Sequence, residues 1–379
     1  MRKAIIIGAG IGGLTAARAL RNRGWDVEVL EARESWETGA GLAVAPNALR
    51  ALDTLGLGDS VRSLAAPGSV GIRSWRGEWL VPAAVDETRE RFGDTIAVVR
   101  RPDLMRILAG VPVTAGSAAR LVDEGGPDRP ALVTTPDGRE REAGLVVAAD
   151  GIRSRARASL FPDHPGPVYS GATAWRLLAE NVDVPTASES WGPEGSFGLM
   201  PLLGGDAYLY AMAWAPAGSG SRDEHTDLLR RFGQWHGPLS EALRRADPGS
   251  VLRKDVWHLA TPPPAYHRGR VALLGDAAHA MTPNLGQGAC QAIEDAVTLA
   301  HSVGGGDEVC RDLAGYTRAR MPRASGIARR SAAFARVSLA RNPVARTLRD
   351  RTLALTARLP NGLAYASLEG LFGWRPPTG

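Results

Sequence analysis

The sequence predicts an α/β protein in which a parallel sheet flanked by helices receives an inserted, mostly antiparallel β-sheet unit and ends in helices. Three observations support this fold class: short apolar runs, a glycine-rich turn between the first run and a helical segment, and an aromatic-rich middle region. Apolar runs without polar alternation are typical of strands covered on both faces. The four runs are Ala4–Ile7, Val27–Leu30, Leu145–Ala149 and Val271–Leu274.

The first two runs flank the helical-looking segment Gly13–Arg21, which gives a β-α-β unit. Between the first run and that segment lies Gly8-Ala9-Gly10-Ile11-Gly12-Gly13. In a turn of this spacing Gly8 permits the tight bend, Gly10 lets the backbone approach a pyrophosphate, and Gly13 lets the helix pack closely on the strand. The helix N-terminus also favours a diphosphate.

Glu31 ends the second strand, 18 residues after Gly13. At that place an acidic side chain accepts hydrogen bonds from an adenosine ribose. Strand, turn, helix and acid together predict a Rossmann-like dinucleotide site. They leave open whether the dinucleotide is NAD or FAD.

The middle of the chain predicts a second, mostly antiparallel sheet with a helix near Asp227–Trp235, and Gly71–Leu80 is expected in the same sheet. Its aromatic residues are Trp175, Trp191, Phe197, Tyr208, Tyr210, Trp214 and Trp257. The predicted division is 1–70, 95–170 and 266–330 for the dinucleotide domain, 71–94 and 171–265 for a substrate domain, and 331–379 for a C-terminal helical segment.

A second glycine-rich turn follows the last apolar run. That run ends in Gly275-Asp276, and Gly286-Gln287-Gly288 precedes another helical segment. Asp276 could bind a polyol such as a ribityl chain, and amides at the helix N-terminus could stabilise negative charge on a reduced flavin. A strand-turn-helix with a capping aspartate is the alternative that this segment alone leaves open.

Residues Leu273–Ala296 resemble the second FAD signature of the flavin monooxygenases related to p-hydroxybenzoate and salicylate hydroxylase. Other segments are similar to that family in the same order along residues 1 to 300. They are Gly39–Leu42 with Pro46–Ala48 and Leu55–Leu57, which resemble the segment passing the flavin ring, Arg101–Leu104, and the Asp-Gly segment Val146–Ser154.

The resemblance implies bound FAD and carries its contacts onto matching residues of this chain. Asp150 and Arg153 match the Asp-Gly motif, which is linked to FAD pyrophosphate and NAD(P)H use. The implied FAD contacts are Gly8, Gly10, Gly12, Gly13, Glu31, Ala32, Gly41, Arg101, Asp150, Asp276, Gly286, Gln287 and Gly288.

Three residues are expected to act in catalysis: Pro283, Arg176 and Tyr208. Pro283 matches the proline near the flavin face where oxygen reacts. The next residue, Asn284, stands where urate-hydroxylating relatives carry an aspartate, which argues against urate as substrate. His279 is expected to have a structural hydrogen-bonding role.

Tyr208 and Tyr210 alternate by two and therefore share one face of a strand. The resemblance places that face in the substrate pocket, with Met200 as a further wall, although a plain core is equally compatible. Arg176 could hold an anionic substrate group, and a surface salt bridge is the alternative.

The implied activity is monooxygenation. NAD(P)H, bound transiently, reduces FAD, O₂ adds to give a flavin C4a-hydroperoxide, and one oxygen passes to an electron-rich, aromatic or polycyclic small molecule by hydroxylation or epoxidation. No second GxGxxG occurs for a separate nicotinamide domain. Two alternatives stay open: an FAD-dependent reductase of the geranylgeranyl reductase type, and a protein that binds FAD without catalysis.

Composition narrows the possible partners and cellular location of the protein. The net charge is +5, but no basic run is interleaved with aromatics as a nucleic-acid groove requires. The two cysteines, Cys290 and Cys310, give neither a disulfide framework nor metal-ligand spacing. No signal-peptide pattern or long apolar run is present. We therefore expect a cytoplasmic protein without a metal, a membrane span or a nucleic-acid partner, and the oligomeric state stays open.

Overall fold

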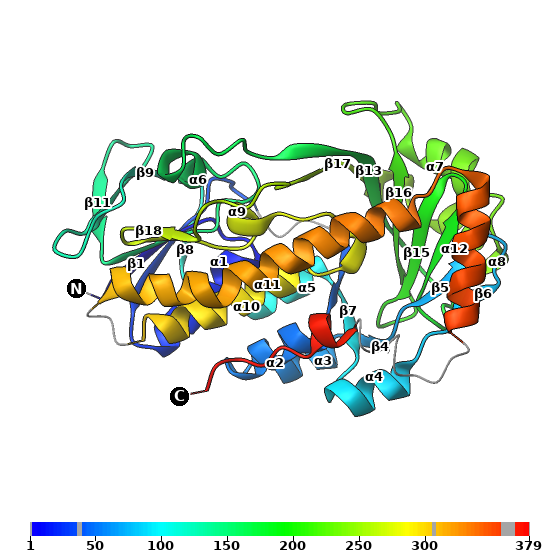
Figure 1. Ribbon diagram of the computed structural model, residues 1–379, viewed down its shortest axis with the longest axis horizontal. Helices are drawn as coiled ribbons and strands as arrows, with labels where there is room; N and C mark the ends of the chain where they lie inside the picture. Colours follow the sequence, from blue (N-terminus) through cyan, green and yellow to red (C-terminus); the bar gives the residue numbers. More distant parts are fainter. Residues whose placement is uncertain (1, 36–39, 305–307, 358–367, 379) are drawn as a thin grey trace.

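The computed structural model describes residues 2–35, 40–304, 308–357 and 368–378 (Figure 1). Its first sheet has six strands, and all neighbours are parallel except the first pair. The four apolar runs form adjacent central strands of this sheet, which confirms the α/β prediction. In spatial order the strands are β18 (His267–Arg268), β19 (Val271–Leu273), β12 (Leu145–Ala148), β1 (Lys3–Ile7), β2 (Asp26–Leu30) and β8 (Val113–Thr114).

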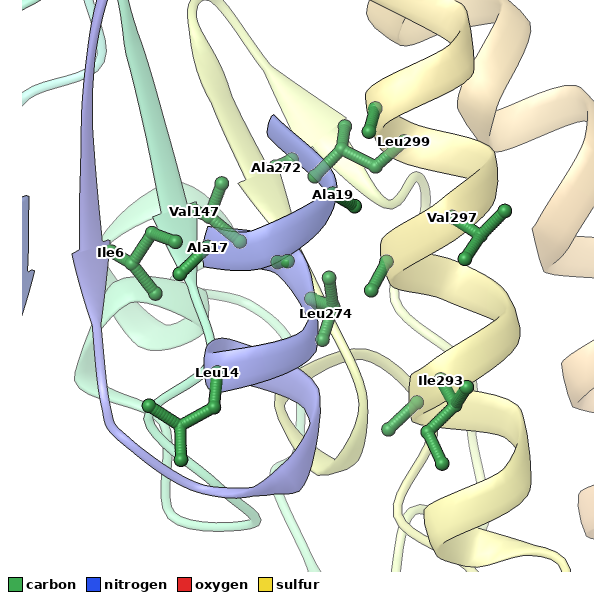
Figure 2. Close-up of a cluster of buried hydrophobic side chains, with 14 of the residues drawn as sticks. Ile6, Leu14, Ala17, Ala19, Val147, Ala272, Leu274, Ile293, Val297 and Leu299 are labelled. Atoms are coloured by element: carbon green, nitrogen blue, oxygen red, sulfur yellow. The ribbon is translucent and has the colours of Figure 1, made fainter. Parts of the chain in front are cut away.

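One face of this sheet is covered by α1 (Ile11–Asn22), and α10 (Gly288–Ser302) packs on α1. Figure 2 shows Leu14 beside the β1 strand and Ile293 of α10 on the far side of α1. The close approach of α1 to α10 needs a residue without a side chain, because a Cβ on Gly12 would lie 3.1 Å from Ala292 Cβ of α10 and 2.5 Å from Leu274 Cδ2. The glycine-rich motif therefore also sets how closely these helices pack.

The strand β2 departs from the expected apolar pattern. Its Glu28 is half-buried and pairs with Lys3, Nζ to Oε2 3.4 Å, and with Arg141. The first residue of the strand is exposed, and only its last two residues are buried. The burial on both faces that we expected for this run therefore holds only at its C-terminal end.

A second sheet of seven strands lies beside the first (Figure 1). All its neighbours are antiparallel except β14 and β5, which are parallel. The segment Gly71–Leu80 belongs to this sheet, as expected, and supplies β5 and most of β6. Helices α7 (Glu224–Phe232) and α8 (Gly237–Arg245) cover one face. The strand order is β17 (Leu252–His258), β13 (Val168–Ala179), β16 (Ala207–Trp214), β15 (Gly195–Pro201), β14 (Ser188–Gly192), β5 (Gly71–Ser74) and β6 (Trp79–Val81).

Two three-stranded sheets were not expected from the sequence. One is β3 (Gly41–Val44), β7 (Ile96–Arg100) and β4 (Ala66–Gly68), and the other is β11 (Glu140–Ala143), β10 (Ala131–Thr134) and β9 (Arg120–Asp123). Further short helices are α2 (Pro46–Asp53), α3 (Gly58–Ser63), α4 (Val85–Phe92), α5 (Arg101–Leu108), α6 (Arg155–Leu160), α9 (Asp276–His279), η1 (Pro248–Ser250) and η2 (Pro283–Leu285).

The long helix α11 (Val309–Ser338) passes from the first sheet to the second, and α12 (Pro343–Thr356) stands at the edge of the second (Figure 1). Position 331 of the proposed domain division falls inside α11. The apolar stripe of α12 is exposed, with Val344, Leu348 and Leu355 at 76%, 66% and 64%. Among the described residues no helix has the length and apolarity to cross a bilayer, and no metal-binding cluster is found.

Candidate cofactor and substrate site

The glycine turn after β1 combines tightly packed glycines with one open glycine. Gly8 has φ +109°, and a Cβ there would lie 2.4 Å from the Ala149 carbonyl oxygen. A Cβ on Gly13 would lie 2.0 Å from the Gly8 carbonyl oxygen. At Gly10, by contrast, no atom lies within 4 Å of the Cβ position. The turn therefore presents open backbone at Gly10, at the N-terminus of α1, where a diphosphate fits.

Glu31 ties the end of β2 to this turn. Its Oε2 accepts a hydrogen bond from the Ala9 amide at 2.7 Å, and its Oε1 accepts one from the Arg33 amide at 2.9 Å. Each carboxylate oxygen keeps a further lone pair for a ligand hydroxyl. Ala32 is exposed beside it. Glu31 thus combines a structural role with the position expected for a ribose contact.

Asp276 begins α9 at the end of β19. Its side chain is exposed, yet the surrounding protein raises the pKa of its carboxyl by desolvation, an effect that His279 and Arg101 oppose. Desolvation also lowers the pKa of Arg101, and Asp276 counteracts that shift. An accessible carboxyl surrounded by protein atoms lies in a concave surface. Asp276, the residue predicted to bind the ribityl chain, and Arg101, the arginine predicted to contact FAD, therefore lie in the same region.

The Asp-Gly segment leaves one acceptor without a partner. Asp150 Oδ2 accepts from the Ala156 amide at 3.2 Å, while the buried Oδ1 has no partner among the described residues. A buried oxygen of this kind needs a ligand or water donor. Arg153 is exposed, with its guanidinium 5.9 Å from the Trp257 ring centroid.

Arg157 was not among the expected site residues, yet it is the arginine that joins this segment to α9. Its Nη1 donates to the Ala277 carbonyl at 2.9 Å, and its Nη2 donates to the Ile152 carbonyl at 2.7 Å. A buried arginine in a short helix has no distinctive sequence pattern, because its acceptors are backbone carbonyls.

The second glycine-rich turn leaves the N-terminus of α10 accessible. Pro283 opens η2, Gly286 has φ +62°, and no atom lies within 4 Å of a Cβ at Gly286 or Gly288. The Gln287 side chain points inward, where its Oε1 accepts from Asn47 Nδ2 at 3.1 Å. Backbone amides at this end can stabilise an anionic ligand edge.

A buried ionic network holds both turns. Asp295 Oδ2 accepts from the Gly275 amide at 3.0 Å and lies 2.5 Å from His279 Nε2, while Oδ1 accepts from Arg320 Nε at 2.6 Å. Burial raises the pKa of Asp295, but His279 and Arg320 lower it to about 2 overall. These contacts give His279 a structural partner and fix Gly275 directly before Asp276.

Glu294 continues the network toward the other turn. It accepts from Asn47 Nδ2 at 2.7 Å and Arg323 Nε at 2.7 Å, and it also pairs with Arg320. The sequence signal for this network was the adjacent pair of acids in an otherwise apolar helix. Sequence reasoning missed it, because the cationic partners follow 25 and more residues later.

On the second sheet, the expected substrate residues lie together. The Tyr208 and Tyr210 ring centroids are 5.7 Å apart, which confirms the shared face, and Met200 packs in the same cluster as Tyr208. Burial raises the pKa of the Tyr208 hydroxyl, and the nearby positive charge of Arg176 opposes that rise. A Cβ on Gly41 would lie 2.4 Å from Tyr208 Cγ, so the tyrosine packs on β3. Gly39 lies outside the described residues.

Four cations face this region. Desolvation lowers the pKa of Lys254, on the neighbouring strand β17, and the positive charges of Arg176, Arg33 and Arg101 lower it further. Asp276 is the acidic group that acts on Arg101. Clustered cations raise the local concentration of anionic ligands, including phosphate groups.

A groove of about 320 Å³ opens between the end of β17, α9 and α11. Its lining includes His258, His279, Arg329 and Arg336, and it does not include the two tyrosines. The groove therefore borders α9, the helix that Asp276 begins, on a different side from the tyrosine face.

The comparisons with known proteins agree with this geometry. Residues 1–331 match the FAD binding domain family. The aurachin C monooxygenase/isomerase of Stigmatella aurantiaca is 36% identical over 359 residues, covering 93% of each chain. The 3-amino-4-hydroxybenzoate 2-monooxygenase of Streptomyces cremeus is 35% identical, covering 86% of this chain and 85% of the relative.

The fold is similar to that of a Klebsiella pneumoniae protein, HpxO, whose structure contains FAD and uric acid. The TM-score is 0.87 at 28% identity, with 98% of this chain and 96% of the other covered. The open backbone at Gly10, the unpartnered Asp150 oxygen and the accessible α10 N-terminus fit FAD. The chain belongs to the FAD binding domain family and is an FAD-dependent monooxygenase of the aromatic-hydroxylase type.

Proposed function

We propose that this enzyme uses NAD(P)H and O₂ to hydroxylate or epoxidise an electron-rich aromatic or polycyclic molecule bound against Tyr208, Tyr210 and Met200. The observation that carries the proposal is the contact of Tyr208 with Gly41. The segment around Gly41 is the one expected to pass the flavin ring, so the tyrosine face adjoins the reacting end of the cofactor. Domain junctions are favoured sites for small ligands.

Bound FAD supplies hydride acceptance and oxygen activation. In the proposal Glu31 and Asp276 would bind its sugar and ribityl hydroxyls, and Arg101 would also contact the FAD. The α10 N-terminus stabilises negative charge on the ring edge. Pro283 lies against the ring face where oxygen is transferred.

The substrate side has an apolar wall with a polar end. Tyr208 is 6% exposed and Met200 5% exposed, so they exclude water from a bound ring. Arg176, whose charge acts on Tyr208, favours a substrate that carries an oxygen acceptor or an anionic oxygen. The names of relatives, 3-amino-4-hydroxybenzoate among them, support a substituted planar ring. Asn284 argues against urate itself, and the same names favour oxygenation over a reductase reaction.

A substrate screen tests the proposal. The purified holoenzyme, which we propose acts in the cytoplasm, is supplied with NADH or NADPH and a panel of phenols, anilines and heteroaromatics. A true substrate accelerates NAD(P)H oxidation and lowers the fraction of O₂ released as hydrogen peroxide, because it captures the activated oxygen. If accelerating compounds leave peroxide release stoichiometric with NAD(P)H oxidation, or if product forms equally well without O₂, the proposal is wrong.

A further inference from the structure

A buried carboxyl on the tyrosine face has no role in the function proposed so far. Glu189 on β14 is 8% exposed. Its Oε1 accepts from Trp191 Nε1 at 2.8 Å and its Oε2 accepts from the Tyr210 hydroxyl at 2.8 Å, and the nearby Ser196 hydroxyl also favours its charged form. No Lys, Arg or His in the described part of the chain pairs with it.

Such a group is costly to keep in a fold. Burial raises the pKa of Glu189, and these three neutral groups only partly oppose that shift. An uncompensated buried carboxyl destabilises a protein unless its hydrogen bonds are satisfied. Because an apolar residue would serve a plain core better, the position of Glu189 calls for a role at the face it shares with Tyr210.

Glu189 fixes the direction of the Tyr210 hydroxyl. The proton of that hydroxyl is donated to Glu189, and burial and Glu189 hold the pKa of Tyr210 well above its usual range, so it stays protonated. The ring is held in place because it lies on Gly198, where a Cβ would come within 2.0 Å of it. Tyr210 is half-buried, and the free lone pair of its oxygen can only accept.

Tyr208 has the opposite polarity. Arg176 lies on the paired strand β13, and its positive charge favours the lone-pair side of the Tyr208 oxygen, so the O–H points away from Arg176 and remains available as a donor. The two rings are 5.7 Å apart between centroids. One phenol of the pair can therefore donate and the other can accept, at neighbouring points of the same face.

We propose that Glu189 determines the substrate class of this pocket: planar rings that present an N–H or O–H donor to Tyr210 and an acceptor oxygen to Tyr208, such as lactams and hydroxy-heteroaromatics. The inference rests on the proposed function for the location of the pocket. Glu189 acts through Tyr210 and is a positioning residue. A site built to pair with a donor rejects analogues that lack it.

The substitution Glu189→Gln reverses the polarity of Tyr210 at nearly constant shape. The Trp191 indole N–H can only donate, so the amide oxygen of the new side chain must face it, and the amide NH₂ then faces Tyr210. Tyr210 would accept from that NH₂ and turn its proton toward the substrate. The matched control is Glu224→Gln, because Glu224 accepts from Trp175 Nε1 at 2.7 Å on the opposite face of the same sheet.

The test is calorimetric titration of the oxidised holoenzyme with 2-quinolone and with 1-methyl-2-quinolone, in which a methyl group replaces the hydrogen of the N–H donor. Wild-type enzyme should bind 2-quinolone about tenfold more tightly. In Glu189→Gln the ratio should fall to about 1, and in Glu224→Gln it should stay near ten. Flavin absorbance and thermal unfolding check that each variant is folded and loaded.

Wild-type enzyme that binds neither probe, or both equally, overturns the inference, and so does a Glu189→Gln variant that keeps the tenfold ratio. If that variant does not fold, Tyr210→Phe takes its place and must lose the ratio as well. The titration uses no reductant and no oxygen. Its failure is therefore distinguishable from failure of the proposed reaction, which the substrate screen measures separately.

Discussion

Replacing Asp295 by Asn tests whether the buried network supports the cofactor strand. Both carboxylate oxygens of Asp295 accept from donors: Oδ1 from Arg320 Nε, and Oδ2 from the Gly275 amide at 3.0 Å. An asparagine must direct its NH₂ group at one of these donors, whichever way the amide is turned. The substitution therefore removes a charge and also creates an unsatisfied contact.

The magnitude follows from the two effects. The pKa of Asp295 falls from 3.8 to about 2 in the folded protein, which corresponds to about 2 kcal/mol of stability at neutral pH. A mismatched buried donor costs about 1–3 kcal/mol. The sum is about 3–5 kcal/mol. With an unfolding entropy of about 2.1 cal/mol/K per residue, Tm should fall by about 4–6 °C.

Chemical and thermal unfolding of the wild-type protein and the Asp295→Asn variant between pH 2 and pH 7 measures this loss of stability. Because the folded pKa is depressed, the charge contribution is fully present above pH 3.8 and is lost as the pH falls through about 2. The difference in free energy of unfolding between wild type and variant should be constant from pH 7 to about pH 5 and should shrink below about pH 4. The control is Asp59→Asn, whose fully exposed carboxyl pairs with Arg62, with an effect below about 1 kcal/mol. If Asp295→Asn lowers the free energy of unfolding by no more than Asp59→Asn does, the reasoning is refuted.

Three further variants probe the site. Asp276→Ala should lower the affinity for FAD about tenfold or more, because a charge-assisted hydrogen bond disappears. The control Asp163→Ala, at an exposed residue, should keep the wild-type FAD occupancy, measured by flavin absorbance. Gly10→Ala should weaken FAD binding while the stability of the apoprotein stays nearly unchanged. Gly8→Ala should lower the stability of the apoprotein in denaturant unfolding, since its Cβ would lie 2.4 Å from a carbonyl oxygen. Equal effects of the two substitutions would contradict the different roles of the two glycines. Tyr208→Phe should change substrate KM or coupling with FAD affinity intact, and a variant with unchanged kinetics would remove Tyr208 from the pocket.

The strands of the first sheet could be predicted because each is a short apolar run beside a turn or helix signal. Val271–Leu273 and Leu145–Ala148 are fully buried, which leaves no polar alternation in the sequence. The glycine turns could be predicted because their requirement is local: φ near +109° at Gly8 allows few residues. The FAD contacts assigned to these turns remain predictions for the variants above to test.

The partners of buried polar groups could not be predicted. Asn47 bonds Glu294 from 247 positions away, and Arg176 comes near Tyr208 only because β13 pairs with β16, where it lies opposite Tyr210. Glu189 looks in the sequence like any charged residue between two serines. Its role depends on Tyr210 two strands away, and periodicity carries no information about that contact.

The central claim is that the protein transfers one atom of O₂ to an electron-rich ring. Once the substrate screen yields a compound, turnover under ¹⁸O₂ with mass spectrometry of the product tests it most directly. The expected result is one ¹⁸O atom in each product molecule and none from labelled water. Product without the label, or equal turnover in the absence of oxygen, would contradict monooxygenation and place the enzyme among the flavin-dependent reductases.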